Sequence, residues 1–174
     1  MRAMVVFESM FGNTQQVAAA IAEGLVSDAR VELVEVNDAP GEIGADIDLL
    51  VVGGPTHAFG MSRPNTRLDA MSKSGRDEAS VGTGIREWIA ALRSTSNATA
   101  VTTFDTRIGS PRVPGSAARA ALKRLRKLGL RVVAPAESFY VSGTPGPLID
   151  GELERARRWG RTLLDSLEID QVSP

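Results

Sequence analysis

The chain alternates between short continuous apolar runs and longer stretches whose apolar residues recur every three or four positions. A short apolar run between turn residues is typical of a strand that is buried on both faces of a sheet. Apolar residues at a spacing of three or four are typical of a helix that buries one face. The patterns predict strands at Ala3–Phe7, Val31–Val36, Asp48–Val52, Ala98–Phe104 and Arg131–Phe139.

Helices are predicted between and after these strands. Trp88 and Trp159 fall on the apolar stripes of two of them, so we expect both tryptophans in the core rather than beside a ligand. Residues Ser62–Gly82, which are rich in Ser, Arg, Asp and Gly, show neither pattern and predict a long loop with room for one short helix. The predicted helices are Thr14–Leu25, Gly84–Leu92, Ser116–Leu128 and Glu152–Leu167.

Five strands separated by helical segments predict an α/β fold with a doubly wound parallel sheet and helices on both faces. No repeat or linker interrupts the pattern, so residues 1–174 are expected to form a single domain. We expect the strand order 2-1-3-4-5. In that order the carboxyl ends of strands 1, 3 and 4 are neighbours, and sheets of this kind bind their ligands there.

Composition narrows the chemistry that this fold can carry. The chain has 174 residues, a formal net charge of −1, no cysteine and a single histidine. The lack of cysteine excludes disulfides, thiol catalysis and cysteine-ligated metals, and one histidine excludes an all-histidine metal site. The near-neutral charge argues against nucleic acid as the main partner. The apolar run in Met1–Ser9 is too short for a signal peptide and no run approaches a membrane span, so we expect a cytoplasmic protein without membrane insertion.

The segment between the first strand and the first helix, Ser9–Thr14, carries the clearest functional signal. A helix N-terminus offers unpaired N–H groups and a partial positive charge, Ser9 and Thr14 add hydroxyl groups, and Gly12 allows a tight turn. The segment therefore suits a phosphate group; alternatively, Ser9 or Asn13 serves only as a helix cap. No Gly-Lys pair and no G-x-G-x-x-G pattern occur in the chain, which excludes a Walker loop and a dinucleotide fingerprint and favours a single terminal phosphate.

Two further loops are expected beside this segment. Gly53–Ser62 follows the third strand and Thr103–Pro111 follows the fourth, and both are rich in Gly, Pro, Ser, Thr and aromatic residues. A phosphate anchor next to two such loops suits a flat heterocycle on a phosphorylated tail.

Residues Val5–Thr14, followed by Ala18 and Ile21, resemble the phosphate-loop signature of the flavodoxin family at every defined position. That signature is two aliphatic residues, an aromatic residue, any residue, Ser or Thr, two residues, a small residue, any residue and Thr, then Ala and an aliphatic residue. Together with Gly53–Ser62, the segment is most similar to small flavodoxin-domain proteins of bacteria. The resemblance implies an FMN-binding redox protein that transfers electrons through a non-covalent flavin and needs no catalytic amino acid.

The resemblance also implies where FMN lies, with its phosphate on the first loop and its ring between the second and third. Phe59 or His57, and Phe104, are the candidates for stacking on the ring, and Gly60 is a candidate for the flexible peptide at flavin N5. Asp105, Thr106 and Arg107 are expected at the pyrimidine edge, through backbone N–H groups and, for Arg107, through its charge as well. The expected cofactor-binding residues are Ser9, Met10, Phe11, Gly12, Asn13, Thr14, Pro55, Thr56, His57, Ala58, Phe59, Gly60, Thr103, Phe104, Asp105, Thr106 and Arg107.

Two features depart from the family pattern. Phe11 stands where many flavodoxins have a Thr, which removes one hydroxyl contact. Electron-transfer flavodoxins are also strongly acidic, whereas this chain has a net charge of −1.

Basic residues outside the loops allow two interpretations. Arg63, Arg67, Arg76 and Arg112 either frame the mouth of the pocket and attract an anionic substrate or nicotinamide phosphate, or are ordinary solvated surface. The run Lys123–Lys127 is most simply the solvated face of a core helix that buries Leu122, Leu125 and Leu128, with docking of an acidic partner as the alternative.

The sequence leaves several functions open. An electron-transfer flavoprotein is the first. A flavodoxin-like NAD(P)H:quinone reductase and a flavin-free binding or regulatory module are the alternatives. The electron donor and acceptor (protein, quinone or nicotinamide cofactor) and the choice between monomer and homodimer are not determined. A phosphorelay receiver is disfavoured, because Gly53-Gly54 and Glu8-Ser9 supply neither its phosphoacceptor Asp nor its acidic pair.

Overall fold

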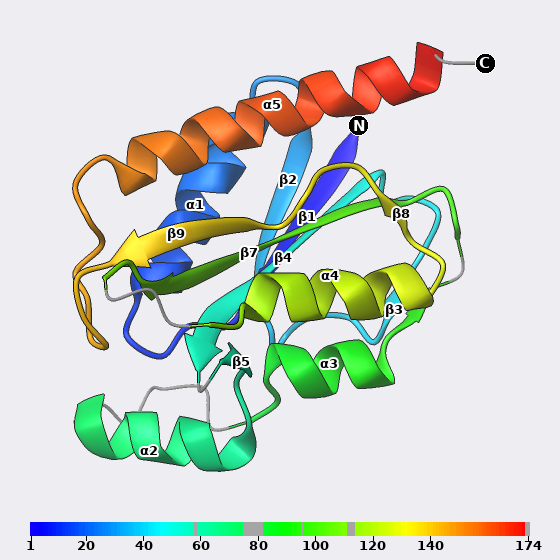
Figure 1. Ribbon diagram of the computed structural model, residues 1–174. Helices are drawn as coiled ribbons and strands as arrows, with labels where there is room; N and C mark the ends of the chain where they lie inside the picture. The colour runs from blue at the N-terminus through cyan, green and yellow to red at the C-terminus, as the bar shows by residue number, and fades with distance from the viewer. Residues whose placement is uncertain (58, 75–81, 95, 111–113, 173–174) are drawn as a thin grey trace.

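The computed structural model describes residues 1–57, 59–74, 82–94, 96–110 and 114–172. A parallel sheet runs through the centre, and helices cover both of its faces (Figure 1). Its strands are β1 (Arg2–Phe7), β2 (Arg30–Glu35), β4 (Leu49–His57), β7 (Ala100–Ile108), β8 (Arg131–Val132) and β9 (Glu137–Val141). The helices are α1 (Asn13–Leu25), α2 (Pro64–Ser74), α3 (Ile85–Ala91), α4 (Ala117–Lys127) and α5 (Glu152–Val172).

The strand order confirms the predicted topology. The order is β2-β1-β4-β7, and both β8 and β9 pair with β7 in parallel, so together they form the fifth strand. The predicted single strand Arg131–Phe139 is interrupted, since residues 133–136 belong to no strand. Pro135 lies in this gap, and a proline cannot donate a hydrogen bond to a neighbouring strand.

Three short strands were not expected from the sequence. β5 (Gly60–Met61) folds back antiparallel onto the end of β4 and makes a hairpin with it. β3 (Glu42–Ile43) and β6 (Arg93–Ser94) form a separate parallel pair. Elements of two residues carry too little periodicity to be recognised in a sequence.

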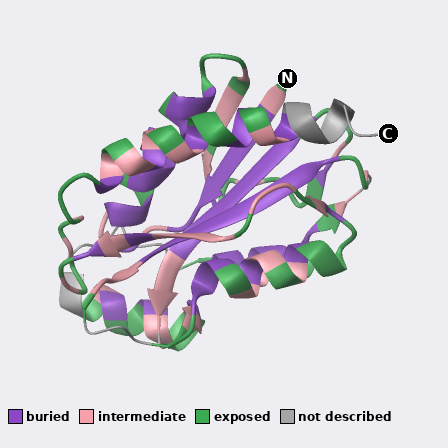
Figure 2. Ribbon diagram, turned by 45° about the horizontal axis from the view of Figure 1, so that its top comes forward, coloured by how far each residue is buried: buried purple, intermediate pink, exposed green. Residues whose placement is uncertain are grey.

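Side chains from the sheet alternate between two hydrophobic cores, one on each face. Helices α1 and α5 cover one face, while α3 and α4 cover the other (Figure 1). Along β1, Val5 belongs to the first core and Val6 to the second, as the period of two requires. Figure 2 shows the central strands buried, whereas the helices on either side of them have buried residues on one face and exposed residues on the other.

The inward faces predicted for the helices are largely confirmed. Trp88 is buried in the second core, and Trp159 is partly buried against the first. Leu125 is fully buried, but Leu128 is 39% exposed. The inward assignment of Leu128 was wrong because this residue lies beyond the last residue of α4, at its C-cap.

The strands that lead to the expected site are longer than predicted. β4 continues to His57 and β7 continues to Ile108, whereas the apolar runs end at Val52 and Phe104. Several positions assigned to loops are therefore strand residues. The Ser62–Gly82 segment contains α2, which is longer than the short helix expected there, and residues 75–81 lie outside the described residues.

Candidate functional site

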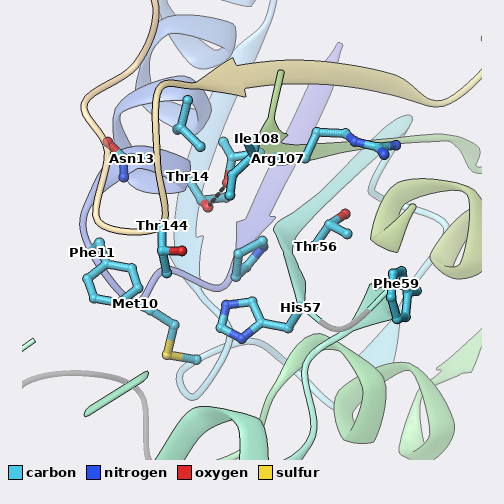
Figure 3. Close-up of a pocket in the computed structure, with 13 residues that line it drawn as sticks. Met10, Phe11, Asn13, Thr14, Thr56, His57, Phe59, Arg107, Ile108 and Thr144 are labelled. Atoms are coloured by element: carbon cyan, nitrogen blue, oxygen red, sulfur yellow. Dashed lines mark hydrogen bonds between the residues drawn. The ribbon is translucent and has the colours of Figure 1, made fainter. Parts of the chain in front are cut away.

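A cavity of about 310 Å³ opens at the carboxyl ends of β1, β4 and β7, where the strand order predicts a ligand (Figure 3). Four segments build it: the first loop with the start of α1, the β4–β5 hairpin, the end of β7, and the chain around the end of β9. Among the described residues that line the cavity there is no Asp or Glu, so the cavity is suited to an anion. The lining residues are Met10, Phe11, Asn13, Thr14, Pro55, Thr56, His57, Phe59, Thr106, Arg107, Ile108, Val141 and Thr144.

The first loop turns sharply into α1. Gly12 has a φ of 87°, a left-handed conformation that favours glycine, and a Cβ added there would meet nothing within 4 Å. The Ser9 hydroxyl accepts hydrogen bonds from the backbone N–H groups of Gly12 (3.1 Å) and Gln15 (3.3 Å). Ser9 therefore satisfies two backbone donors at the start of the helix, although the N-cap residue itself is Gly12. Both contacts use the hydroxyl oxygen as acceptor, so its proton is still available to donate.

Two side chains at the start of α1 connect the first loop to other parts of the site. Thr14 shares a hydrogen bond of 2.7 Å with Thr106 at the end of β7, through their hydroxyl groups. The Asn13 amide donates to the carbonyl of Pro145 at 3.2 Å, in the loop that follows β9. These contacts fix the helix N-terminus against the cavity wall.

The β4–β5 hairpin presents two aromatic rings in different directions. His57 pairs with Gly60, and Phe59 between them has a φ of 72° and is 61% exposed. In Figure 3 the His57 ring points toward Met10, whereas Phe59 lies on the far side of the strand end. Gly60 does not line the cavity, and Ala58 lies outside the described residues.

The structure corrects the expected positions of three residues on β7. Thr103 and Phe104 are buried within the sheet and do not line the cavity. The Thr103 hydroxyl donates to the carbonyl of Ala118 in α4 at 2.9 Å, on one face of the sheet. Phe104 points to the other face and packs edge-on against Phe139 and Trp159, so it is not available to stack on a flavin.

Asp105, the third of these residues, anchors α4 instead of facing the cavity. Its Oδ2 accepts hydrogen bonds from the hydroxyls of Thr56 (2.9 Å) and Ser116 (2.6 Å) and from the N–H of Ala118 (3.0 Å). A carboxylate in this position is stabilised by the partial positive charge of the helix N-terminus. Asp105 and Thr106 also pair with β4 on one side and with β9 on the other, so their backbone groups lie within the sheet and do not face a ligand. The Thr106 side chain, in contrast, lines the cavity.

A buried polar network behind the first loop has no counterpart in the sequence predictions. Glu8, which is 1% exposed, accepts hydrogen bonds from the Ser62 hydroxyl and from the N–H of Ile85 (2.9 Å). Arg67, which is 2% exposed, donates to Ser62 Oγ (2.9 Å), Glu87 Oε2 (3.0 Å) and the carbonyl of Gly82 (3.1 Å). The network joins the residue before the first loop to α2 and α3.

Burial raises the pKa of the Glu8 carboxyl, and the hydrogen bonds from Ser62 and Ile85 and the charge of Arg67 only partly oppose this. The folded protein therefore binds the Glu8 proton more tightly than the unfolded chain does. The stabilising contribution is full below the unfolded pKa and is lost as the pH rises through the folded pKa.

We accordingly expect Glu8→Gln, which keeps the shape and is neutral at every pH, to gain thermal stability relative to the wild type as the pH rises. Melting temperatures of both proteins between about pH 4 and about pH 8 check this. Glu42→Gln, at an exposed position, is the control and should show no such trend. A constant difference between wild type and Glu8→Gln across the pH range would contradict the assignment.

The burial of Arg67 also settles part of the question about the basic residues. Arg67 does not frame the pocket mouth, because its guanidinium group is enclosed between Ser62 and Glu87. Arg63 is exposed and does not line the cavity. Arg76 and Arg112 lie outside the described residues.

Three lining residues were missed by the sequence analysis. Ile108 lies within the Thr103–Pro111 segment that was expected to face the ring, but its apolar side chain carried no chemical signal. Val141 is the last residue of β9 and Thr144 follows it, at a strand end that opens on the same edge of the sheet. The rule that predicted the other loops, applied to this strand as well, would have found them.

Other kinds of site find no support in the described part of the chain. No group of three or more His, Asp or Glu side chains there is arranged to hold a metal ion. None of the described helices is both long enough and apolar enough to cross a membrane.

Comparison with known proteins agrees with this geometry. The sequence model of the flavodoxin family matches residues 5–153. A flavodoxin from the domain Archaea is 19% identical, with a TM-score of 0.62, and the alignment covers 97% of this chain and 99% of that one. Oxidised flavodoxin 1 from Bacillus cereus is 18% identical, with a TM-score of 0.66 and coverage of 95% and 98%.

A flavodoxin from Streptococcus pneumoniae TIGR4 is 16% identical, with a TM-score of 0.62 and coverage of 95% and 99%. At these identities the structural likeness shows the fold alone. A comparison with curated proteins finds no match. The family model spans most of the chain, including the first loop and the two neighbouring strand ends. The chain therefore belongs to the flavodoxin family, whose cofactor is FMN.

Proposed function

We propose that this protein transfers electrons between redox partners through FMN bound non-covalently in the cavity at the carboxyl ends of β1, β4 and β7. The observation that carries the proposal is the open turn at Gly12. The left-handed glycine leaves free space at the N-terminus of α1, beside a cavity whose described lining residues include no carboxylate. A phosphate monoester fits such a place, since it gains from the helix dipole and from hydroxyl donors.

The residues present fit FMN in the following way. The Ser9 hydroxyl, with its proton free to donate, and the N–H groups at the start of α1 would hold the phosphate. Thr14 and Thr106, which already share a hydrogen bond, would border the phosphate and the sugar chain. Met10, Phe11, Pro55 and Ile108 add apolar surface for a flat ring system, as flavin sites require.

His57 is the better candidate for covering the ring, and Phe59 the weaker one. The His57 side chain points into the cavity toward Met10, whereas the Phe59 ring borders the cavity but is 61% exposed (Figure 3). Arg107 also lines the cavity, and a cation near a flavin raises its reduction potential by stabilising the reduced anion. Gly60 remains a candidate for the peptide at flavin N5.

FMN, when bound, supplies the redox chemistry by accepting and donating electrons. The protein's own residues bind and orient the cofactor and limit the access of water, and none of them is assigned an acid–base or nucleophilic role. Flavodoxins transfer electrons to protein partners, and we infer the same general role here. We also propose that residues 1–174 act as one domain; the cytoplasmic location and the choice between monomer and homodimer stay predictions.

The direct test is the visible absorbance of the purified protein before and after incubation with FMN and removal of free flavin. We expect a stoichiometric flavin spectrum that survives desalting, and a melting temperature that rises with FMN concentration. Steady-state assays with NAD(P)H and a quinone then separate the two redox functions, and turnover without any partner protein would favour the quinone reductase. Absence of both flavin retention and thermal stabilisation would reject the proposal and leave the binding module.

A further inference from the structure

Four arginine side chains gather around the β4–β5 hairpin, beside the cavity. Arg86 Nε donates to the carbonyl of Ser62 (3.0 Å) and Arg86 Nη2 to that of Met61 (2.8 Å), which fixes its guanidinium group against β5. Arg67 lies on the same segment, bonded to Ser62 Oγ. Burial, followed by the positive charges of Arg124 and Arg63, lowers the pKa of Arg86, so these groups are close enough to repel one another.

Among the described residues, Glu87 is the carboxylate that acts on Arg86 against these positive charges. Glu87 is paired with Arg67, and Glu8 is enclosed behind it with a raised pKa. Within the described ranges, no carboxylate forms an ion pair with Arg63, Arg86 or Arg124. The described residues here therefore carry a local excess of positive charge, on a chain whose overall charge is −1.

An exposed aromatic ring lies next to the cluster. Phe59 is the residue before β5, to which Arg86 is bonded, and it is 61% exposed. The backbone of Phe59 lies close against Gly115, since a Cβ added to that glycine would be 2.0 Å from the Phe59 carbonyl oxygen. An exposed aromatic residue among arginines has the composition of an interface hot spot, in which the ring supplies contact area and the arginines supply charge.

We propose that Phe59, Arg63, Arg86 and Arg124 form a docking surface for a protein that is acidic around its own redox centre. The surface is continuous with the proposed flavin cavity, because Phe59 lines that cavity as well. None of the four arginines lines the cavity, so a small anion would find charge there without an enclosing pocket. Positive charge confined to this side of a weakly negative molecule would orient an acidic partner with its redox centre toward the cavity.

This proposal rests on the proposed electron-transfer function, but the first experiment does not need flavin. Fluorescein-labelled poly-L-glutamate is titrated with the protein, with and without FMN, and binding is followed by fluorescence anisotropy. We expect affinity to fall about 10-fold as NaCl rises from about 20 mM to about 200 mM. The double variant Arg63→Gln/Arg124→Gln should bind about 10-fold more weakly than the wild type at the lower salt concentration.

The matched control is Arg30→Gln/Arg158→Gln. It removes the same two charges from exposed positions on β2 and α5, away from the hairpin. Its affinity for polyglutamate should stay within about 2-fold of the wild type. Phe59→Ser should weaken binding about 3-fold at both salt concentrations, since salt does not screen the contact of an uncharged ring. Equal losses in the docking and control variants would overturn the proposal, because they would reflect net charge only.

The second experiment uses the salt dependence of the electron-transfer rate to find the sign of the charge near the flavin cavity. The FMN-loaded protein is photoreduced and mixed with ferricyanide or hexaammineruthenium(III), each of which takes up one electron from the protein. The net charge predicts that ferricyanide is repelled, so that added salt speeds its reaction. The docking surface predicts the reverse: salt slows ferricyanide and speeds the ruthenium complex, and the docking variant, unlike the control, reduces both trends.

The outcomes separate the two proposals. Salt trends that follow the net charge, in a protein that retains FMN, would overturn the docking surface and leave the electron-transfer function intact. Failure to retain FMN would reject that function, whatever the polyglutamate result. A third outcome is that inorganic pyrophosphate displaces polyglutamate at low micromolar concentration while Phe59→Ser binds polyglutamate as the wild type does. The surface would then bind a small anion and not an acidic protein, which would overturn the proposal.

Discussion

Gly12→Asp is expected to abolish FMN binding without unfolding the protein. The substitution puts a carboxylate at the N-terminus of α1, where the proposed phosphate would lie, and repulsion between the two anions should weaken FMN binding by about 100-fold or more. The same carboxylate interacts favourably with the helix dipole and can cap the helix. Stability of the FMN-free protein and affinity for FMN should therefore change independently, which isothermal titration with FMN and thermal unfolding of the FMN-free protein can show.

Gly12→Asn is the matched control for this experiment. Asparagine has the shape of aspartate and tolerates the left-handed backbone that Gly12 adopts, at a φ of 87°, but it carries no charge. A Cβ at this position meets nothing within 4 Å, so neither variant should clash with the fold. We expect Gly12→Asn to lose about 10-fold or less in FMN affinity, through backbone strain and crowding of the phosphate. The same dissociation constant in both variants would mean that the phosphate is not bound next to Gly12.

Arg67→Met is expected to cause a large loss of stability. Removing one member of a buried ion pair leaves its partner's charge uncompensated and costs about 3–5 kcal/mol. Glu87 is 35% exposed and stays partly hydrated, so we expect the lower end of this range. The substitution also takes a donor from Ser62, which in turn bonds Glu8. For a chain of this length, a change of that size lowers the melting temperature by about 10 °C. Thermal unfolding of the FMN-free protein measures the effect directly.

Arg63→Met, four positions earlier, provides the comparison. Arg63 is exposed and makes no ion pair with a described residue, so its replacement should change stability by no more than about 0.5 kcal/mol. Arg67 Nε is buried without a hydrogen-bond partner, so one donor of the intact network is left unsatisfied. If Arg67→Met proved as stable as Arg63→Met, this unsatisfied group would have offset the ion pair, and the network would not be a major source of stability.

The parts of the site that could be predicted from the sequence are those with local causes. The first loop was recognisable because a strand, a glycine turn and a helix start follow one another within ten residues, Val5–Thr14. The strand order followed from the alternation of strands and helices, and the order placed three loops at one edge of the sheet. Ten of the seventeen expected residues accordingly line the cavity: Met10, Phe11, Asn13, Thr14, Pro55, Thr56, His57, Phe59, Thr106 and Arg107.

The wrongly placed site residues have a common cause, which is that the ends of the strands were predicted too early. An apolar run shows where a strand is buried but not where its hydrogen bonding stops, so β7 was ended four residues early, at Phe104. Within a strand, successive side chains point to opposite faces. Thr103 therefore faces α4 and Phe104 faces α5. In a loop, as the sequence analysis expected, both side chains could have turned toward the ligand.

Sequence alone determined the fold class, the strand order and the loop that defines the family, because each depends on patterns within one or two elements. Only the tertiary structure decided the polar network and the charged surface. Glu8 bonds Ser62 and Ile85, which lie 54 and 77 positions further along the chain. Arg86, Arg63 and Arg124 come from α3, the segment before α2, and α4. A carboxylate or a guanidinium group has the same appearance in a sequence whether it is solvated or enclosed, and folding brings distant segments together to decide which.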